Sequence, residues 1–448
     1  MADYRHECLT NSAINVRTFR QSDRGVKQMP VNPRRLVVRG LARLERTPGA
    51  AGQSILRHLL DGPDARELDV RDRSLITSCF YGVLRWRIRL DSHIAAHARK
   101  GVPSDPELAN ILRLGVFQLL FLDRVPARAA VHTSVSLARK LRGQAVGKFV
   151  NGVLRSIDRH REPPSDLATR YGHPAWMVER LQEHLGDTVE ARLKANMTPP
   201  PVHLRVHPNA KHKTDDLTAT THPDVYIASA EETGSRMIRQ GIREGLWLPQ
   251  DRASVEVCDL LAIDTTRLDM LELCCGRGVK TTRFLEKRQQ MGTQGHYIAV
   301  DASLPRLHEA NRLCDRWLPA HDAVFIAADA SAALPIDPEI QFDRIIIDAP
   351  CSGLGVIRRR PEILWRRSPD DIATLAALQR DIVHQAAARL RPGGQLVYAV
   401  CTRTPEETTS VVQDLASTSD LHIEREVDFS PEVDGCDGFY AARMKKPG

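Results

Sequence analysis

The sequence lacks any apolar run near the ~18 residues that a membrane-spanning helix requires. Its first 30 residues also lack the apolar segment of a secretory signal. The nine cysteines include no C-x-x-C pair, which argues against a zinc site and against a disulfide framework. These absences predict a cytoplasmic, reducing compartment, with no metal and no membrane partner. The 448 residues, 42% of them hydrophobic, are enough for two or three domains.

Positive charge is unevenly distributed along the chain. Residues 1–162 contain 29 Lys and Arg against 15 Asp and Glu, a net charge of +14. The remaining residues contain 34 against 41, a net charge of −7. A basic front part suggests an anionic partner, most often nucleic acid, but solvated helix faces would give a similar count. Charge alone leaves these two interpretations about even.

The front part reads as a series of helices. Segments over residues 33–160, such as "PELANILRLGVFQLLFLDR", repeat apolar residues at three- and four-residue steps, and turn signals such as "GVPSDP" separate them. Residues 1–28 are polar and show no periodicity. We therefore predict a disordered tail over 1–28 and a helical domain over 29–162.

The pattern changes twice after the helical domain. Residues 163–262 predict a helical connector followed by a small α+β subdomain. The subdomain begins with extended backbone, because the prolines in "TPPPVHLRVHP" favour that conformation. Residues 263–448 alternate strands with helices, which is typical of a doubly wound, mostly parallel α/β sheet. The segment "GFYAARMKK" near the C-terminus predicts a final edge strand.

A glycine turn marks the first strand of this sheet. In "LELCCGRGVKTT" (271–282), Gly276 and Gly278 allow the backbone to approach a ligand, and the following helix offers free N–H groups. Such turns occur in dinucleotide sites and adenosyl cofactor sites alike, and an ordinary tight turn is the plain alternative. The spacing of a phosphate loop is absent.

Two aspartates end the next strands. Asp301 follows the glycines by about 20 residues, where an acidic side chain typically accepts hydrogen bonds from ribose hydroxyls. Asp329 ends "FIAAD" and would suit an adenine amino group. Each aspartate is alternatively a helix or turn cap, and for Asp329 that alternative is nearly as strong.

Two cysteines follow the later strands. Cys351 comes after Asp348 in "IIIDAPCSGLG", and Cys401 ends "LVYAVC". Adjacent parallel strands would place both thiols at the ligand-binding edge of the sheet. A single cysteine there would more often be a small buried hydrophobe, but a pair favours a site. A thiolate that adds to C6 of a pyrimidine makes C5 able to accept a methyl group, and a second thiol would assist the later release.

At these residues the chain closely resembles the Sun/Fmu family of RNA cytosine-5 methyltransferases. The motifs are "LELCCGRGVKTT", "VDASLPRL", "DAPCSGLGVIRRRPEI" and "YAVCTRTPEE". Through "CFYGVLR", "LRLGVFQLLFL" and "KFVNGVLR", the front part resembles a NusB-like RNA-binding domain. This fusion resembles the 16S ribosomal RNA methyltransferase B group. The resemblance implies a NusB-like helical bundle followed by a Rossmann-like class I methyltransferase fold.

The resemblance also implies roles for individual residues. It implies S-adenosylmethionine as the methyl donor, Cys401 as the nucleophile and Cys351 as the thiol that assists product release. Asp348 would contact the base or the cofactor, and Lys280 would lie near the reaction centre. The residues implied to hold the cofactor are Cys274, Cys275, Gly276, Arg277, Gly278, Val279, Lys280, Asp301, Arg306, Asp329 and Asp348.

The chain departs from the family pattern at several positions, including "VCT" in place of the usual T-C-S around Cys401. Arg277 stands where the family has proline, Val279 where it has glycine, and His207 where it has asparagine. The glycine turn nevertheless keeps the general E-x-x-x-G-x-G pattern of adenosylmethionine sites. We expect an altered turn that still binds the cofactor.

The segment "VIRRRPEILWRR" (356–367) suggests RNA contact, because it places five arginines just after Cys351. Arg358, Arg359, Arg360 and Arg366 are predicted to contact phosphates beside an extruded base, although a solvated basic loop would look the same. We expect a monomer that acts on ribosomal RNA. The alternatives are a methyltransferase of tRNA or another RNA, and a non-catalytic RNA-binding assembly factor, which only the altered glycine turn supports.

Overall fold

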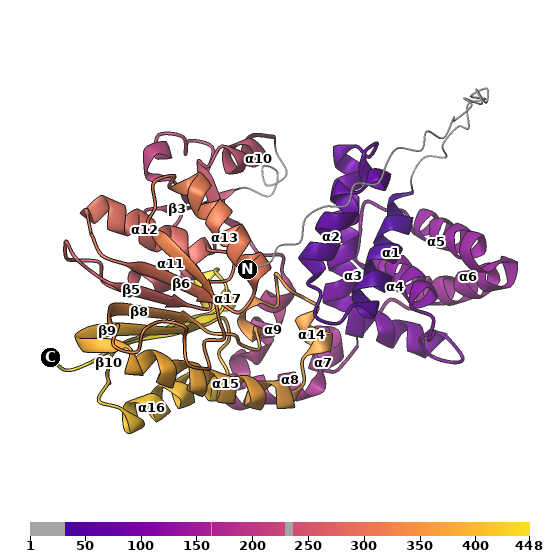
Figure 1. Ribbon diagram of the computed structural model, residues 1–448. Coiled ribbons are helices and arrows are strands. Elements are labelled where there is room, and N and C mark those ends of the chain that lie inside the picture. The colour runs from indigo at the N-terminus through magenta and orange to yellow at the C-terminus, as the bar shows by residue number, and fades with distance from the viewer. Residues whose placement is uncertain (1–31, 163, 229–235) are drawn as a thin grey trace, which may run out of the picture.

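The computed structural model describes residues 32–162, 164–228 and 236–448 (Figure 1). The tail predicted over residues 1–28 lies outside these ranges. Among the residues described, no helix is long and apolar enough to cross a membrane.

The front part of the chain is a bundle of helices, as the apolar periodicity predicts. Side chains of Asn32, Asp69 and Asp105 accept hydrogen bonds from the first backbone N–H groups of three of these helices. The apolar stripes of the helices meet in one buried core. The helices are α1 (Pro33–Arg46), α2 (Gly52–Asp61), α3 (Val70–His97), α4 (Pro106–Phe121), α5 (Ala127–Arg142) and α6 (Gln144–Arg159).

A helical connector and a small antiparallel sheet follow. The sheet has the order β2-β3-β1-β4 and encloses its own apolar core. The connector contains α7 (Leu167–Arg170), α8 (Ala175–Leu185) and α9 (Val189–Met197). The subdomain contains β1 (Val202–Val206), β2 (Thr218–Ala219), β3 (Val225–Ala228), α10 (Arg236–Arg243), β4 (Trp247–Pro249) and α11 (Arg252–Asp259).

The back part is built on a sheet of seven strands with the order β10-β11-β9-β8-β5-β6-β7. Strands β9, β8, β5, β6 and β7 run parallel to one another. The chain passes outward from β5 to β7 and then returns to place β8 on the other side of β5. This reversal is the position at which such sheets bind ligands, beyond the carboxyl ends of the strands. The strands are β5 (Met270–Leu273), β6 (Tyr297–Asp301), β7 (Ala323–Ala327), β8 (Phe342–Asp348), β9 (Leu390–Val400), β10 (His422–Phe429) and β11 (Phe439–Lys445).

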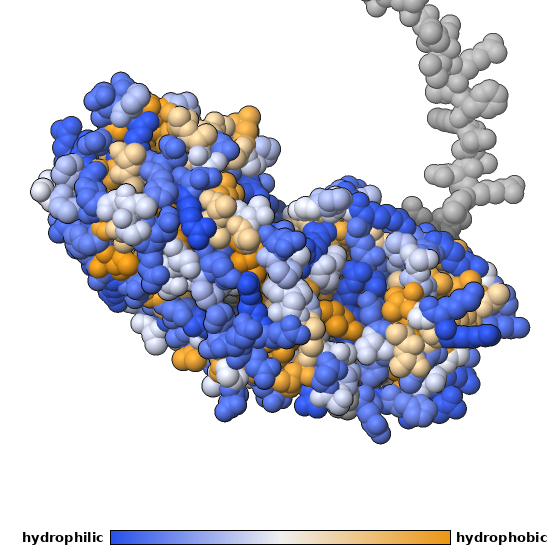
Figure 2. Space-filling view, turned by 90° about the horizontal axis from the view of Figure 1, so that it is seen from below, coloured by the Kyte–Doolittle hydropathy of each residue, from blue (hydrophilic) through white to orange (hydrophobic). Residues whose placement is uncertain are grey.

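Helices cover both faces of this sheet (Figure 1). Two separate apolar cores result, one beneath α11, α12 and α13, the other beneath α15 and α16. The face seen in Figure 2 is mostly hydrophilic, with hydrophobic residues in small separate groups. The helices of this part are α12 (Val279–Met291), α13 (Leu304–Trp317), α14 (Ile363–Arg366), α15 (Pro369–Ala388), α16 (Thr409–Thr418) and α17 (Pro431–Asp434).

The predicted position of the last strand is wrong. β11 does not form the edge of the sheet, because it pairs with β9 on one side and with β10 on the other, antiparallel to both. β10 is the true edge, and most of its side chains are exposed. An exposed strand that is largely polar gives little apolar alternation in the sequence, so the pattern did not reveal it.

The segment 356–367 joins the part built on the seven-stranded sheet to the helical bundle. Glu362 Oε1 accepts a hydrogen bond of 2.9 Å from the backbone N–H of Gly52. Arg366 donates to the carbonyl oxygens of Leu44 (2.6 Å) and Thr47 (3.2 Å). The Arg87 guanidinium lies 4.3 Å from the centroid of the ring of Trp365, the residue before Arg366. The bundle therefore packs against the rest of the protein through α14 (Figure 1).

Three of the arginines predicted to bind RNA make contacts within the protein. Arg358 is only 5% exposed and donates to Asp437 at 2.9 Å. Arg359 donates to Asp251 at 2.7 Å, and Arg366 is occupied by the bundle. Their guanidinium groups hold parts of the protein together, and the Arg359 side chain is still 31% exposed. Arg360 is exposed, and its RNA contact stays a prediction.

Candidate active site

The glycine turn between β5 and α12 has a left-handed backbone. Cys274 (φ 61°), Gly276 (φ 59°) and Gly278 (φ 77°) all lie in this region, which is rare for a residue with a side chain such as Cys274. At Gly278 an added Cβ would come within 2.8 Å of Ala310 Cβ, so glycine is required for α13 to pack there. The turn is thus fixed by its close packing against α13.

The same turn fits the adenosyl cofactor that the sequence predicts. An added Cβ at Gly276 would meet no atom within 4 Å, so the backbone there faces open space. Asp301, at the end of β6, accepts hydrogen bonds of 2.9 Å from the N–H groups of Gly276 and Ser303. Each carboxylate oxygen keeps a free lone pair for a ribose hydroxyl. Together with the N–H groups at the start of α12, this arrangement provides a cradle for the cofactor.

Three other predicted cofactor residues lie on the exposed rim of this cradle. Arg277 forms an ion pair of 2.9 Å with Glu309 on α13, so the arginine that replaces the family proline points along the surface. Arg306 is exposed in the first turn of α13. Asp329 is exposed and accepts hydrogen bonds from Ser331, which lower the pKa of Asp329. Asp329 therefore caps a turn, and its contact with adenine stays a prediction.

The two predicted thiols meet at the carboxyl ends of β8 and β9. These strands pair in parallel, and Cys351 Sγ lies 3.3 Å from Cys401 Sγ. The sequence argument from adjacent strand ends placed both residues correctly at one edge of the sheet. Within the described residues, no group of three His, Cys, Asp or Glu side chains is placed to hold a metal ion.

The contact between the thiols separates their pKa values. The hydrogen bond from Cys351 is the main factor that lowers the pKa of Cys401; Arg360 and Lys280 lower it further, while burial and Asp348 oppose them. The same hydrogen bond, together with burial, raises the pKa of Cys351 well above its usual value. Cys401 is therefore the thiol that ionises more readily, which suits a nucleophile.

Lys280 and Asp348 form a partly buried ion pair beside the thiols. Lys280 Nζ donates to Asp348 Oδ2 at 2.7 Å and lies 5.3 Å from the centroid of the Phe439 ring. Burial would lower the pKa of Lys280, but the charge and hydrogen bond of Asp348 outweigh burial and raise it. The lysine thus stays cationic between the cofactor turn and Cys401.

Family models and curated relatives match this chain over most of its length. A model described as 16S rRNA methyltransferase RsmB/F matches residues 260–445, the NusB family matches 31–159, and an RsmF/B-like ferredoxin-like domain matches 173–230. Ribosomal RNA small subunit methyltransferase B of Vibrio cholerae is 34% identical over 85% of this chain and 91% of its own length. The chain belongs to the RsmB/F methyltransferase family.

Two further comparisons agree with this assignment. The probable ribosomal RNA small subunit methyltransferase B of Bacillus subtilis is 30% identical over 86% of this chain and 93% of its own length. The solved structure of PH0851 has the same fold, with a TM-score of 0.77 and 21% identity over 94% of this chain and all of that one. As an RsmB/F family member, the chain is a methyltransferase that uses S-adenosylmethionine.

Sequence reasoning missed Glu407, which organises the thiol loops of this RsmB/F enzyme. Its side chain is fully buried and accepts hydrogen bonds from the backbone N–H of Ser352 (2.7 Å) and from the hydroxyls of Ser352 (2.5 Å) and Thr404 (2.8 Å). Glu407 therefore joins the loop after Cys351 to the loop after Cys401. The "TPEE" motif contains this residue, but only the fold shows which carboxylate turns inward.

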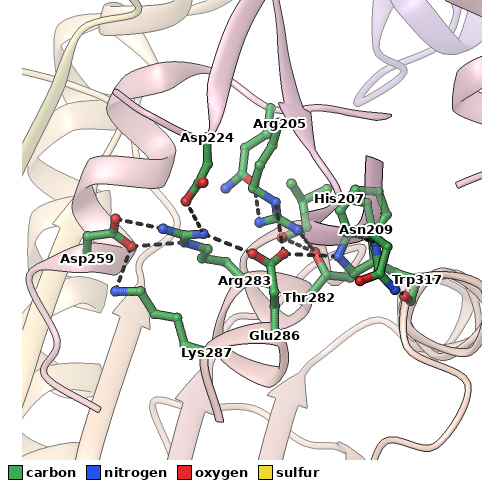
Figure 3. A network of polar contacts seen from close by, with 12 residues as sticks. Arg205, His207, Asn209, Asp224, Asp259, Thr282, Arg283, Glu286, Lys287 and Trp317 are labelled. Carbon is green, nitrogen blue, oxygen red and sulfur yellow. Dashed lines mark hydrogen bonds and ion pairs between the residues drawn. The ribbon is translucent and has the colours of Figure 1, made fainter. Parts of the chain in front are cut away.

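A buried polar network anchors α12 from the side of the small sheet (Figure 3). Arg205 on β1 donates to Thr282 on α12 and to Gln250, each at 2.6 Å, and its guanidinium lies 5.1 Å from the Trp317 ring centroid. His207, which replaces the family asparagine, donates from Nε2 to the Trp317 carbonyl at 3.2 Å. Because α12 begins at the cofactor turn, the network holds that turn in place.

We expect Arg205→Met to lower the free energy of unfolding by about 3 kcal/mol, because breaking a buried charged contact leaves its partners unpaired. The Arg205 side chain is 0% exposed and its Nε lies 3.7 Å from Glu286. Urea titration of the full chain measures the change. Arg277→Met is the control, since its exposed ion pair contributes about 0–1 kcal/mol. An equal decrease in the free energy of unfolding of the two variants would show that the buried network does not stabilise the fold.

Proposed function

We propose that this chain methylates C5 of a cytosine in small-subunit ribosomal RNA through a covalent RNA–protein intermediate. The main support is the pair of thiols 3.3 Å apart beside the cofactor cradle. A methyltransferase that acts on a nitrogen would not need a nucleophilic thiol, since an amino nitrogen has its own lone pair. The names of the relatives in Vibrio and Bacillus support ribosomal RNA as the substrate.

The proposed reaction begins with the Cys401 thiolate. Its sulfur forms a bond to C6 of the extruded cytosine, and the electron pair of the C5–C6 double bond moves so that C5 becomes nucleophilic. S-adenosylmethionine, when bound, supplies an electrophilic methyl group to C5. Asp348, which is paired with Lys280 and whose charge raises the pKa of Cys401, accepts a hydrogen bond from N3 of the base when that nitrogen carries a proton.

Release requires two bonds to break. The proton leaves C5, its electron pair reforms the C5–C6 double bond, and the Cys401 sulfur departs. Cys351 assists this stage, because its Sγ lies 3.3 Å from that of Cys401 and its raised pKa keeps it protonated: its thiol gives its proton to the departing sulfur, and the thiolate so formed accepts the proton from C5. Glu407 keeps both thiol loops in place during these steps.

Bisulfite sequencing of ribosomal RNA from cells with and without the gene tests the proposal, because 5-methylcytosine resists conversion. We expect one small-subunit cytosine to lose protection when the gene is removed. Loss of protection only in tRNA or in the large-subunit RNA would identify that RNA as the substrate instead. Unchanged protection in every RNA would support the non-catalytic assembly factor instead.

We expect Arg360→Gln to shift the pH dependence of methyl transfer to higher pH. The positive charge of Arg360 lowers the pKa of Cys401, so its removal raises that pKa and reduces the thiolate fraction at neutral pH. Rates should converge again at high pH, where Cys401 is ionised in both proteins. Single-turnover rates between pH 6 and 10 measure the shift.

The control for this shift is Arg312→Gln, which removes one exposed charge from α13. It should leave the pH profile unchanged. If Arg360→Gln instead raises KM for RNA without shifting the pH profile, Arg360 contacts phosphate, as the sequence predicts, and does not influence the ionisation of Cys401.

A further inference from the structure

A cavity of about 430 Å³ lies between the helical connector and the loop that follows Cys401. Its volume is within the range of ligand sites. One wall comes from α8, and the other from the turn after Cys351 and the strand end of β11. The lining includes Trp176, Leu181, Leu354, Pro405 and Tyr440. None of the cofactor or thiol residues described above lines it, so the proposed chemistry leaves the cavity without a role.

The cavity adjoins the nucleophile through the backbone. Gly355 lines it, and the N–H of Gly355 donates to the carbonyl oxygen of Cys401 at 3.0 Å. Arg403 and Thr404, two and three residues after Cys401, line it as well. The cavity therefore lies one residue layer from the backbone that carries the Cys401 thiol.

The charges of the cavity do not suit a phosphate. Its three arginines each face a carboxylate: Arg180 with Glu406 at 2.6 Å, Arg192 with Glu432 at 2.5 Å, and Arg403 with Asp428. Their positive charges are thereby largely compensated.

What remains is an apolar surface with Trp176 and a few hydrogen-bonding atoms. A flat, uncharged heteroaromatic ring suits this surface, since bases stack on aromatic side chains in single-stranded RNA sites.

We infer that this cavity binds one unpaired nucleobase of the substrate RNA, next to the target cytosine. The inference rests on the proposed function, because it supplies the second contact that orients the RNA strand across Cys401. Trp176 stacks on this base. The site selects targets by requiring a second extruded or unpaired base beside the cytosine.

The test uses a synthetic RNA that spans the cytosine identified by bisulfite sequencing, with copies that carry an abasic nucleotide at each of the two positions on either side. The full chain and labelled S-adenosylmethionine give kcat and KM for each RNA. We expect one abasic position to raise KM by about tenfold, as loss of one stacked base does. Trp176→Ala should raise KM for the intact RNA by about the same factor, with no further rise on that abasic RNA. Trp176→Phe should retain the wild-type KM.

A second variant distinguishes loss of the base-binding site from a folding defect. Leu181→Trp fills the cavity from α8 and should reproduce the abasic effect while the affinity for S-adenosylmethionine stays unchanged. The inference is overturned if no abasic position raises KM, or if the effects of Trp176→Ala and the abasic nucleotide multiply. In either case the unsubstituted chain would still methylate the intact RNA. Loss of all methyl transfer by the unsubstituted chain would overturn the proposed function, and this inference with it.

Discussion

Cys401→Ala is expected to abolish methyl transfer to RNA, with a rate reduced by at least about a thousandfold. The reason is that C5 of cytosine is a poor nucleophile until a thiolate has added at C6, and no other group replaces that covalent step. The variant should also form no covalent adduct with RNA. Incorporation of labelled methyl groups into undermethylated small-subunit RNA measures the first effect, and denaturing gels measure the second.

The loss should be specific to chemistry. Affinity for S-adenosylmethionine should be unchanged in Cys401→Ala, because the cofactor cradle is formed by other residues. Cys79→Ala is the matched control, since it removes one buried thiol from α3 in the helical bundle and should retain methyl transfer. Substantial methylation by Cys401→Ala would eliminate the covalent mechanism.

The sequence predicted the parts of this site that depend on strand ends. Cys351 and Cys401 each follow an apolar run, and parallel pairing of β8 with β9 brings such positions together in any doubly wound sheet. Gly276, Gly278 and Asp301 were predictable for the same reason, because their positions depend on local turns and on the order of strands. The helical bundle was predictable from the long stretches of three- and four-residue periodicity.

The sequence could not predict what depends on tertiary partners. Three of the four arginines predicted to bind RNA bond to carboxylates or backbone carbonyls that are distant in the sequence, such as Asp437 for Arg358. A guanidinium has the same sequence signal whether it faces a phosphate or a buried acid. Glu407 was missed for the reverse reason, since its partner Ser352 is 55 residues away and nothing local marks its burial.

Cys351→Ala is expected to accumulate an RNA–protein adduct that survives denaturation. Cys401 can still attack C6 in this variant, but the thiol that assists proton loss from C5 and release of the sulfur is gone, so the intermediate persists. Gel electrophoresis in denaturant with labelled RNA should show a retarded band in Cys351→Ala and little in the wild type. The Cys351→Ala/Cys401→Ala double variant should show none.

The pH dependence of this adduct provides a stricter test of the two roles. The hydrogen bond from Cys351 is the main factor that lowers the pKa of Cys401, so removing it raises that pKa. Adduct formation by Cys351→Ala should therefore be slow at neutral pH and increase as the pH rises and Cys401 ionises. If Cys401→Ala forms the adduct and Cys351→Ala does not, then Cys351 is the nucleophile. In that case the lowered pKa of Cys401 would not mark the nucleophile.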